Sequence, residues 1–219
     1  INTGDALFVL SNLAMMDLVP THPAETVIKC AKILHDTCLD LTRGQYLDMS
    51  YEKRTDLTIE DYWPMIGGKT AALLSACCTL GSLLSEVDES TQEAYRDFGR
   101  YLGLAFQVQD DLLGIWGDSA LTGKSAESDL VSGKKSLPIL FGLEKKGPFA
   151  RQWVDGPVHP EEVASLAKQL AMEGARLYTQ ETADQMTDLA LQSLRMADPQ
   201  GEAGEALFEL VDKLLNREA

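Results

Sequence analysis

Two adjacent carboxylates, Asp110 and Asp111, are the residues of this sequence whose types and spacing point most directly to chemistry. They lie in the helical stretch Gly99–Trp116, and no Lys or Arg is found within one turn of either acid. Burying two ionised carboxylates on an apolar helix without partners would cost several kcal/mol each. Either the pair faces solvent near the helix end, or a basic side chain or a divalent cation faces it. Mg²⁺ suits such hard oxygen ligands, because it usually takes one or two carboxylates together with substrate phosphates.

Lysines beside small residues form the second chemical feature. They occur in Gly68–Thr70, in Gly123–Ser125 and at Lys134–Lys135. In an acidic chain this pattern is typical of anion-binding sites, although each lysine alone could be an ordinary surface residue. A nucleotide P-loop is excluded, because its first glycine would have to stand where Trp63 or Asp118 stands, and because both stretches follow helical segments.

The segment Gly117–Lys135 follows the helix of the two acids directly. It is rich in Gly and Ser, with lysines and acids interleaved. Such a segment is typical of a loop that closes over an anionic ligand held by a metal, and equally of a disordered surface connection. Composition alone leaves both interpretations open.

The elements that must position these residues are helices. Apolar residues recur at intervals of three and four, most clearly in Val27–Leu41, Ile66–Leu84, Tyr95–Trp116, Val163–Thr179 and Ala206–Leu215. Breaks are expected at Pro20–Pro23, Ser50–Thr58, Glu86–Ser90, Gly117–Ser132, Gly147–Pro160 and Asp198–Gly204. Thr58 and Asp61 have the spacing of a capping box. The sequence predicts a single all-α domain over residues 1–219, with about seven to nine helices and no sheet.

Composition narrows the class of protein. The 219 residues carry 34 acids and 19 bases, a net charge of −15, which disfavours binding to nucleic acid or anionic lipid. No apolar run reaches the roughly eighteen residues of a membrane span. The four cysteines lack a C-x-x-C spacing, which indicates free thiols in a reducing compartment and hence a cytoplasmic location.

Several ordered segments together resemble the trans-polyprenyl (isoprenyl) diphosphate synthases. The string FQVQDD at Phe106–Asp111 resembles the second aspartate-rich motif of that family. The other matching segments, at the family's spacing, are INTGDALF at Ile1–Phe8, GQYLDMSYE at Gly44–Glu52, YWPMIGGKTAALL at Tyr62–Leu74, TGK at Thr122–Lys124 and SDLVSGKKSLP at Ser128–Pro138. These six segments are spread over residues 1–138, whereas residues 139–219 add only a helical pattern.

The resemblance implies an antiparallel all-α bundle around a deep central cavity, in a homodimer without a membrane span. It implies a prenyltransferase that uses Mg²⁺ to ionise an allylic diphosphate, whose cation then joins isopentenyl diphosphate to give a longer trans-polyprenyl diphosphate. Concentrated positive charge would stabilise the departing diphosphate, and a dry apolar cavity would protect the cation.

Carried over position by position, the resemblance assigns Asp110 to Mg²⁺. Asp111 is expected to orient metal-bound water or to act as a second ligand. The remaining expected roles are diphosphate binding by Lys69 and Lys124, closure of the loop on phosphate by Lys134, and stabilisation of the cation by the oxygens of Thr70 and Gln107.

Two departures from the family pattern stand out. The second motif usually reads D-D-x-x-D, but the third acid is replaced here by Gly114, and Asp118 is a candidate to substitute for it. The first D-D-x-x-D motif, which normally precedes the segment resembling Ile1–Phe8, is absent. Either the sequence lacks its N-terminal part or the protein is a shortened relative, and the start at Ile1 rather than Met favours the former.

Two other functions stay open. A class I terpene cyclase on the same fold would ionise the same substrate but close a ring. FQVQDD argues against it, because cyclases favour an N-S-E type of second motif. A noncatalytic subunit of a heteromeric synthase is the other alternative, and the presence of Asp110, Lys69 and Lys124 argues against that.

Overall fold

The computed structural model describes residues 1–117, 128–154, 158 and 161–215, and this part of the chain contains helices and no strand. The α-helices are α1 (Asn2–Met16), α2 (Ala24–Tyr51), α3 (Ile59–Ile66), α4 (Ala72–Leu84), α5 (Glu89–Trp116), α7 (Ser128–Ser132), α8 (Leu137–Lys145), α9 (Pro148–Val154), α10 (Val163–Met172), α11 (Ala175–Ala197) and α12 (Gly201–Leu215). A π-helical turn, η1 (Gly67–Ala71), joins α3 to α4. The predicted all-α fold is confirmed.

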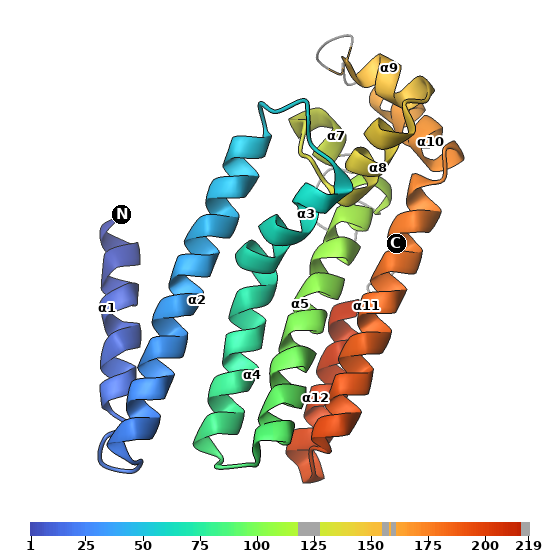
Figure 1. Ribbon diagram of the computed structural model, residues 1–219. Coiled ribbons are helices and arrows are strands. Elements are labelled where there is room, and N and C mark those ends of the chain that lie inside the picture. The colour runs from blue at the N-terminus through green and yellow to red at the C-terminus, as the bar shows by residue number, and fades with distance from the viewer. Residues whose placement is uncertain (118–127, 155–157, 159–160, 216–219) are drawn as a thin grey trace.

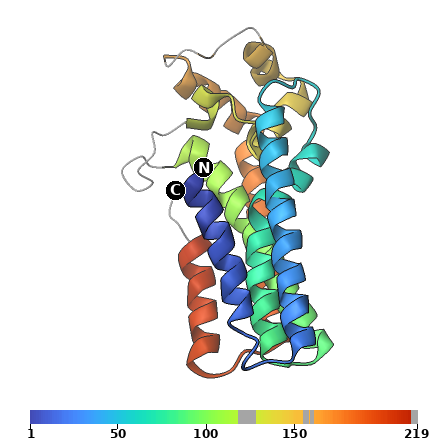
Figure 2. The ribbon, with the colours of Figure 1, turned by 90° about the vertical axis from the view of Figure 1, so that its left-hand side faces the viewer.

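The long helices form a bundle in which α5 is the central element (Figure 1). It packs most extensively against α11 and α4, while α2 packs on η1 and α4. The short helices α7 to α10 gather at one end of the bundle, above the end of α5 that carries the two acids. Figure 2 shows α1 and α12 on the same side of the molecule, each running along the bundle.

The described residues contain more helices than the sequence predicted, because short helices occupy segments assigned as breaks. One of them, α7, lies within Gly117–Ser132, and α9 lies within Gly147–Pro160. The predicted helix Val163–Thr179 is divided between α10 and α11 at Gly174, whose φ of +94° is a left-handed conformation that suits glycine. Five-residue and seven-residue helices are too short to show a hydrophobic period, so the periodicity missed them.

Local sequence explains where the main helices begin. The capping box is present at α3: Asp61 accepts a hydrogen bond from the Thr58 backbone N–H at 2.9 Å. At the start of α5, Asp88 accepts a hydrogen bond from the Thr91 backbone N–H at 3.1 Å. These caps fix the ends of the two helices that carry the candidate site.

Apolar side chains beneath the acids join three helices. Tyr62 and Ile66 of α3 pack with Val108 of α5 and with Leu137 and Leu140 of α8, all of them buried. Burying one such side chain contributes about 1.5–3 kcal/mol. The acid-bearing end of α5 is therefore held by a core that α3 and α8 share.

The helical stretch Ile59–Leu84 has the length and composition of a membrane span. Only 22% of its most apolar window is buried inside the protein. The stretch comprises α3, η1 and α4, and it packs against α2 and α5. Helix α1 also exposes apolar residues, since none of its side chains is buried and Leu7, Val9 and Leu10 are each more than half exposed. Two surfaces of the bundle are therefore apolar in this chain.

Candidate active site

The Asp111 carboxylate is the centre of the candidate site, because four protein donors converge on it. Its Oδ2 accepts hydrogen bonds from the Tyr62 hydroxyl at 2.7 Å and from the Leu137 backbone N–H at 3.1 Å. Its Oδ1 accepts from Lys134 Nζ at 2.8 Å and from Gln107 Nε2 at 3.1 Å. The residue is fully buried. Such a charge is tolerated inside a protein only when it is paired and hydrogen-bonded in this way.

Gln107 links Asp111 to the helix of the candidate anion-binding lysine. One turn before Asp111 on α5, its Nε2 donates to Asp111 and its Oε1 accepts from the Thr70 hydroxyl at 2.7 Å. The amide orientation is fixed by a donor on one side and an acceptor on the other. Thr70, Gln107 and Asp111 therefore form one hydrogen-bonded chain between η1 and α5.

The π-helical turn η1 places Lys69 beside Thr70 and against α2. Lys69 Nζ forms an ion pair with Asp48 of α2, and both side chains are partly buried. The two backbones approach so closely that a Cβ on Gly44 would lie 2.1 Å from the Lys69 backbone nitrogen. A Cβ on Gly68 would lie 2.7 Å from the Asp40 carbonyl oxygen. π-helical turns are often found at functional sites. Glycine at both positions allows the contact that fixes Lys69.

Lys134 joins Asp111 to a further acid, Asp129. Its Nζ lies 2.8 Å from Asp111 Oδ1 and 3.7 Å from Asp129 Oδ2. A tight turn holds Asp129 and Lys134 together: the Lys134 N–H donates to the Asp129 carbonyl at 3.1 Å, and Gly133 has a φ of +72°. This bond and the left-handed glycine are features of a Schellman ending, and they terminate α7. The two carboxylates raise the pKa of Lys134 well above its usual value, against the opposing effect of burial.

Asp129 is a site residue that the sequence analysis missed, as is Tyr62, which donates to Asp111. Asp129 is 7% exposed, and its Oδ2 has no hydrogen-bond partner among the described residues. Burial raises its pKa to about 6, with Lys134 acting in the opposite direction. The Ser136 hydroxyl also acts to lower this pKa, but its geometry falls outside that of a hydrogen bond. Its place in SDLVSGKKSLP was visible, but nothing in the sequence indicated that this acid is buried beside Asp111.

Asp110 is only partly buried, unlike its neighbour Asp111. Its charge acts on the pKa values of Lys134, Asp129 and Tyr62, so it belongs to the same electrostatic cluster. Among the described residues, Asp111, Asp129 and Asp110 all act on the Lys134 ammonium. Carboxylate oxygens of this kind are the donors that Mg²⁺ prefers.

The residues therefore fit a magnesium ion that a substrate helps to hold. Within the described ranges no group of three or more Asp, Glu, His or Cys residues forms a complete metal site. Mg²⁺ does not require one, because waters and substrate phosphates commonly complete its six positions. Four protein donors already occupy the oxygens of the buried Asp111, whereas Asp110 is partly exposed, so a substrate-held ion would reach Asp110 more readily.

The structure brings most of the sequence-predicted residues together. Thr70, Gln107, Asp111 and Lys134 are linked by hydrogen bonds, and Lys69 is adjacent to Thr70. Lys134 forms ion pairs with the carboxylates of Asp111 and Asp129. The sequence predicts instead that it closes the loop on a phosphate of the substrate. Lys124, Asp118 and most of the predicted loop Gly117–Lys135 lie outside the described residues.

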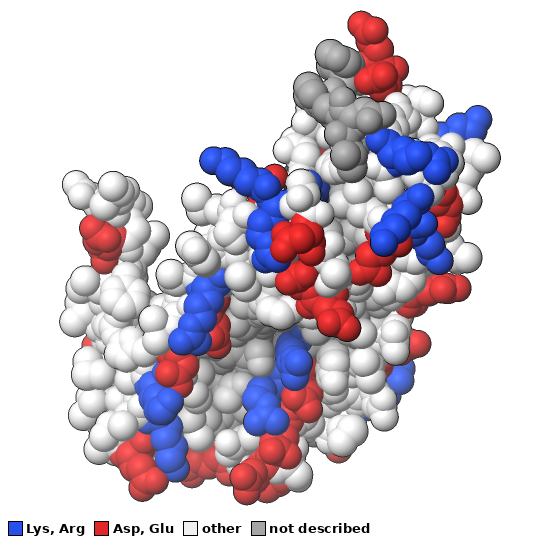
Figure 3. Space-filling view, turned by 45° about the horizontal axis from the view of Figure 1, so that its top comes forward, with Lys and Arg blue, Asp and Glu red and all other residues white. Residues whose placement is uncertain are grey.

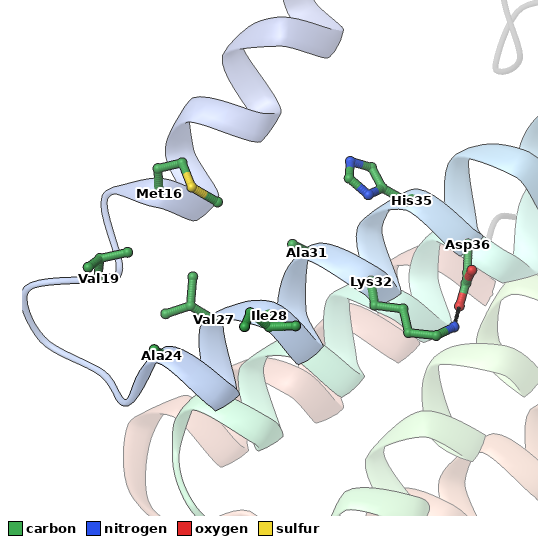
Figure 4. A pocket seen from close by; sticks show the side chains of 9 residues that line it. All are labelled: Met16, Val19, Ala24, Val27, Ile28, Ala31, Lys32, His35 and Asp36. Atoms are coloured by element: carbon green, nitrogen blue, oxygen red, sulfur yellow. Dashed lines mark hydrogen bonds and ion pairs between the residues drawn. The ribbon is translucent and has the colours of Figure 1, made fainter.

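Three cavities among the described residues lie away from the acids. One, of about 560 Å³, lies between α1 and α2 and is mostly apolar, with His35, Lys32 and Asp36 at one side (Figure 4). A second, of about 690 Å³, lies between α4, α5 and α12. The third, of about 760 Å³, lies between residues 55–58 and the helices α8 and α9. Figure 3 shows basic and acidic side chains intermixed over the end of the bundle that carries α7 to α10.

Comparison with known proteins gives the same family as the sequence motifs. The family model "Polyprenyl synthetase" matches residues 1–171. A geranylgeranyl diphosphate synthase of Mycobacterium tuberculosis (strain ATCC 25618 / H37Rv) is 40% identical over 149 residues, which cover 68% of this chain and 42% of that protein. The chain thus spans less than half of that relative's length.

Solved structures agree with the match. The polyprenyl synthetase from Streptomyces coelicolor A3(2) has a TM-score of 0.86 and 32% identity, covering 98% of this chain and 66% of its own. A geranylgeranyl pyrophosphate synthase from Corynebacterium glutamicum, complexed with isoprenyl diphosphate and magnesium, has a TM-score of 0.79 and 26% identity, covering 90% and 57%. With its fold, its acid-bearing helix and its match over residues 1–171, the chain belongs to the polyprenyl synthetase family.

Proposed function

We propose that the protein is a trans-polyprenyl diphosphate synthase, which condenses isopentenyl diphosphate with an allylic diphosphate in a Mg²⁺-dependent reaction. The observation that carries this proposal is the chain of hydrogen bonds from Thr70 through Gln107 to Asp111. It fixes a partly exposed acid, Asp110, and an anion-binding candidate, Lys69, on two neighbouring helices. A metal-assisted departure of diphosphate needs a carboxylate that holds the metal and a cationic side chain that binds the diphosphate, in such an arrangement.

Each residue of the site has a distinct proposed role. Asp110 is a direct ligand of Mg²⁺, which when bound neutralises charge on the departing diphosphate. Asp111 is a positioning residue, since three of its four hydrogen bonds tie α5 to α3, to α8 and to Lys134 in the turn after α7. Lys69 binds the diphosphate, and Asp48 holds its ammonium in the site. Lys124 is proposed as a second diphosphate-binding residue.

The polar oxygens of Thr70 and Gln107 are proposed to lie beside the first carbons of the allylic substrate. The Thr70 hydroxyl donates a hydrogen bond to Gln107, so the lone pairs of its oxygen can face a developing positive charge. The Gln107 Oε1 atom also keeps one acceptor position. Because both side chains are held by partners, little reorganisation is needed when the charge develops.

The exposed apolar face of α1 and α2 supports a homodimer. Leu7, Leu10, Ile28 and Tyr46 are all more than half exposed on these two helices. Exposed apolar side chains that gather into a patch mark protein interfaces. We propose a cytoplasmic dimer in which the stretch Ile59–Leu84 belongs to the bundle, because η1 and α4 pack against both α2 and α5 and α3 packs against α2.

The assay that tests this function offers the full-length protein isopentenyl diphosphate with dimethylallyl, geranyl or farnesyl diphosphate. A Mg²⁺-dependent product longer by one or more isoprene units is expected, and chelation of the metal should abolish it. A cyclic hydrocarbon from the allylic substrate alone would instead identify a terpene cyclase. Product formation only after addition of a partner synthase would identify a noncatalytic subunit.

A further inference from the structure

Tyr62 of α3 contacts the acid-bearing end of α5 through a buried hydrogen bond. Its hydroxyl donates to Asp111 Oδ2 at 2.7 Å, and the whole residue is buried. The ring packs in the core that joins α3, α5 and α8, and it lies edge-on to Trp63 with 5.4 Å between the ring centres. A buried hydroxyl needs a hydrogen-bond partner, so this bond fixes the orientation of the ring and of the carboxylate together.

The same helical stretch contacts α5 a second time, eight residues later at Thr70. The Thr70 hydroxyl donates to Gln107 at 2.7 Å, and Gln107 donates to Asp111 at 3.1 Å. The path of hydrogen bonds thus starts and ends on this stretch, at Tyr62 and at Thr70, and crosses α5 between them. A rotation or a shift of α3 and η1 against α5 would break the bond at one end or at the other.

The π-helical turn η1 allows both side chains to point towards α5. Over eight residues of regular α-helix, two side chains would point about 80° apart around the helix axis. In η1 the Ala72 N–H donates to the carbonyl of Gly67, five residues back, so this turn holds one residue more than an α-helical turn. The extra residue reduces the angle between Tyr62 and Thr70. The bond from Tyr62 therefore also fixes the rotation of η1, which carries Lys69 and Thr70.

We infer that Tyr62 is a positioning residue, whose hydroxyl fixes the rotation of η1 on α5 and thereby places Lys69 and Thr70. The hydroxyl is enclosed by the core and by Asp111, so it acts through these residues and not on a substrate. The catalytic consequence rests on the proposed synthase function. The effect on the packing of η1 against α5 stands on geometry alone.

The effect on packing is tested by a double-variant stability cycle on the purified protein. Tyr62→Phe and Thr70→Val each remove one hydroxyl from the path, and each should lower the melting temperature. The loss in the double variant should be smaller than the sum of the two, because either variant alone already frees η1 to rotate. Tyr51→Phe is the matched control, since its hydroxyl donates to the Asp61 carbonyl at 3.2 Å, in the same core but outside the path. Combined with Thr70→Val, it should give an additive loss.

The catalytic consequence is tested with the full-length enzyme. Tyr62→Phe should lower turnover about 10-fold and raise the Mg²⁺ concentration for half-maximal activity, as loss of a partner behind a metal site typically does. KM for the allylic diphosphate should also rise, because Lys69 would be displaced. Tyr51→Phe also removes a buried hydroxyl that bonds to α3. It should lower the melting temperature similarly and leave these kinetic values unchanged.

Two results would overturn the inference. One is an additive loss for Tyr62→Phe with Thr70→Val, which would show that the two hydroxyls act independently. The other is equal kinetics of Tyr62→Phe and Tyr51→Phe, which would leave Tyr62 a purely structural role. A wild-type enzyme that forms no elongated product would refute the proposed function instead. The stability cycle uses no substrate, so it would still decide whether Tyr62 and Thr70 act together.

Discussion

The two ends of α5 both depend on carboxylates, but they hold them by opposite means. At the first residue before the helix, Asp88 is exposed, and its partners Ser90 and Thr91 are its own sequence neighbours. Near the other end, Asp111 is buried, and three of its four donors, from Tyr62, Lys134 and Leu137, are more than twenty residues away. One acid is a local helix cap and the other organises the tertiary structure.

The pKa of Asp88, at the start of α5, and that of Asp129, which lies on α7 against the other end of α5, are shifted in opposite directions. Hydrogen bonds from Ser90 and Thr91 lower the pKa of Asp88 to about 2, so its ionised form favours the folded state. Burial raises the pKa of Asp129 to about 6, so its ionisation in the folded state is resisted. The exposed carboxylate of a cap stabilises its helix while it stays in water. In the buried cluster of Asp111, Asp129 and Lys134, a bound cation would offset the negative charge of the carboxylates.

The largest effect is expected from Asp111→Asn, which would remove the organising charge. The new side-chain amide nitrogen at position 111, itself a donor, would face two of the present hydrogen-bond donors. Lys134 would also lose the carboxylate closest to its ammonium. Breaking a buried ion pair typically costs about 3–5 kcal/mol, so urea unfolding should show a loss of that size. Asp184→Asn on the exposed surface of α11 is the control and should change stability little. A loss below about 1 kcal/mol for Asp111→Asn would show that the buried Asp111 contributes no more to stability than an exposed carboxylate does.

Asp110→Ala should affect turnover more than stability. If Asp110 holds the metal, kcat should fall about 10²-fold or more at saturating Mg²⁺, with little change in KM for the allylic substrate. Steady-state kinetics of the full-length enzyme measure this split. Asp88→Ala, at the opposite end of the same helix, is the control and should keep normal turnover. Near-normal kcat in Asp110→Ala would contradict the metal assignment.

Gly44→Ala should disturb the site through the backbone. Its Cβ would lie 2.1 Å from the Lys69 nitrogen, so α2 and η1 must separate and Lys69 must move. We expect a loss of about 1–3 kcal/mol in the free energy of unfolding and a higher KM for the allylic diphosphate. Gly81→Ala on α4 is the matched control, because no atom lies within 4 Å of its Cβ, and it should gain about 0.5–1 kcal/mol. Equal responses of the two glycines would show that the close contact is unimportant.

The smallest effect is expected at Asp88. Asp88→Ala should lower the urea midpoint at neutral pH, because the cap is lost. The difference from wild type should shrink as the pH falls from about 4 towards 2, since stability from a lowered pKa is present above the usual value of 3.8 and is lost on protonation. Asp88→Asn should keep most of the cap and lose this pH dependence. An alanine variant whose deficit is unchanged at pH 2 would assign the cap to something other than charge.

The sequence by itself determined the helical class, the capping box at Thr58 and the pair Asp110–Asp111, because each depends on residues within a turn or two of one another. Ordered motifs also determined the family. The burial of the two acids differs in a way that the sequence could not specify. Adjacent residues on a helix point about 100° apart, and only the neighbouring helices decide which one is buried.

Tertiary structure alone decided the partners of the buried charges. Lys134 was expected to bind phosphate, yet the turn at Gly133 directs it to Asp111 and Asp129. The loss of the acid at Gly114 was visible in the sequence, and Asp118 was the nearest candidate along the chain. Asp118 lies outside the described residues, and a side chain at 114 would meet the Asp129 carboxylate because α7 packs against α5. The partners of a helix cap are sequence neighbours, so the sequence predicts them well. The partners of a buried carboxylate are set by which helices pack together, so they can lie far away in the sequence.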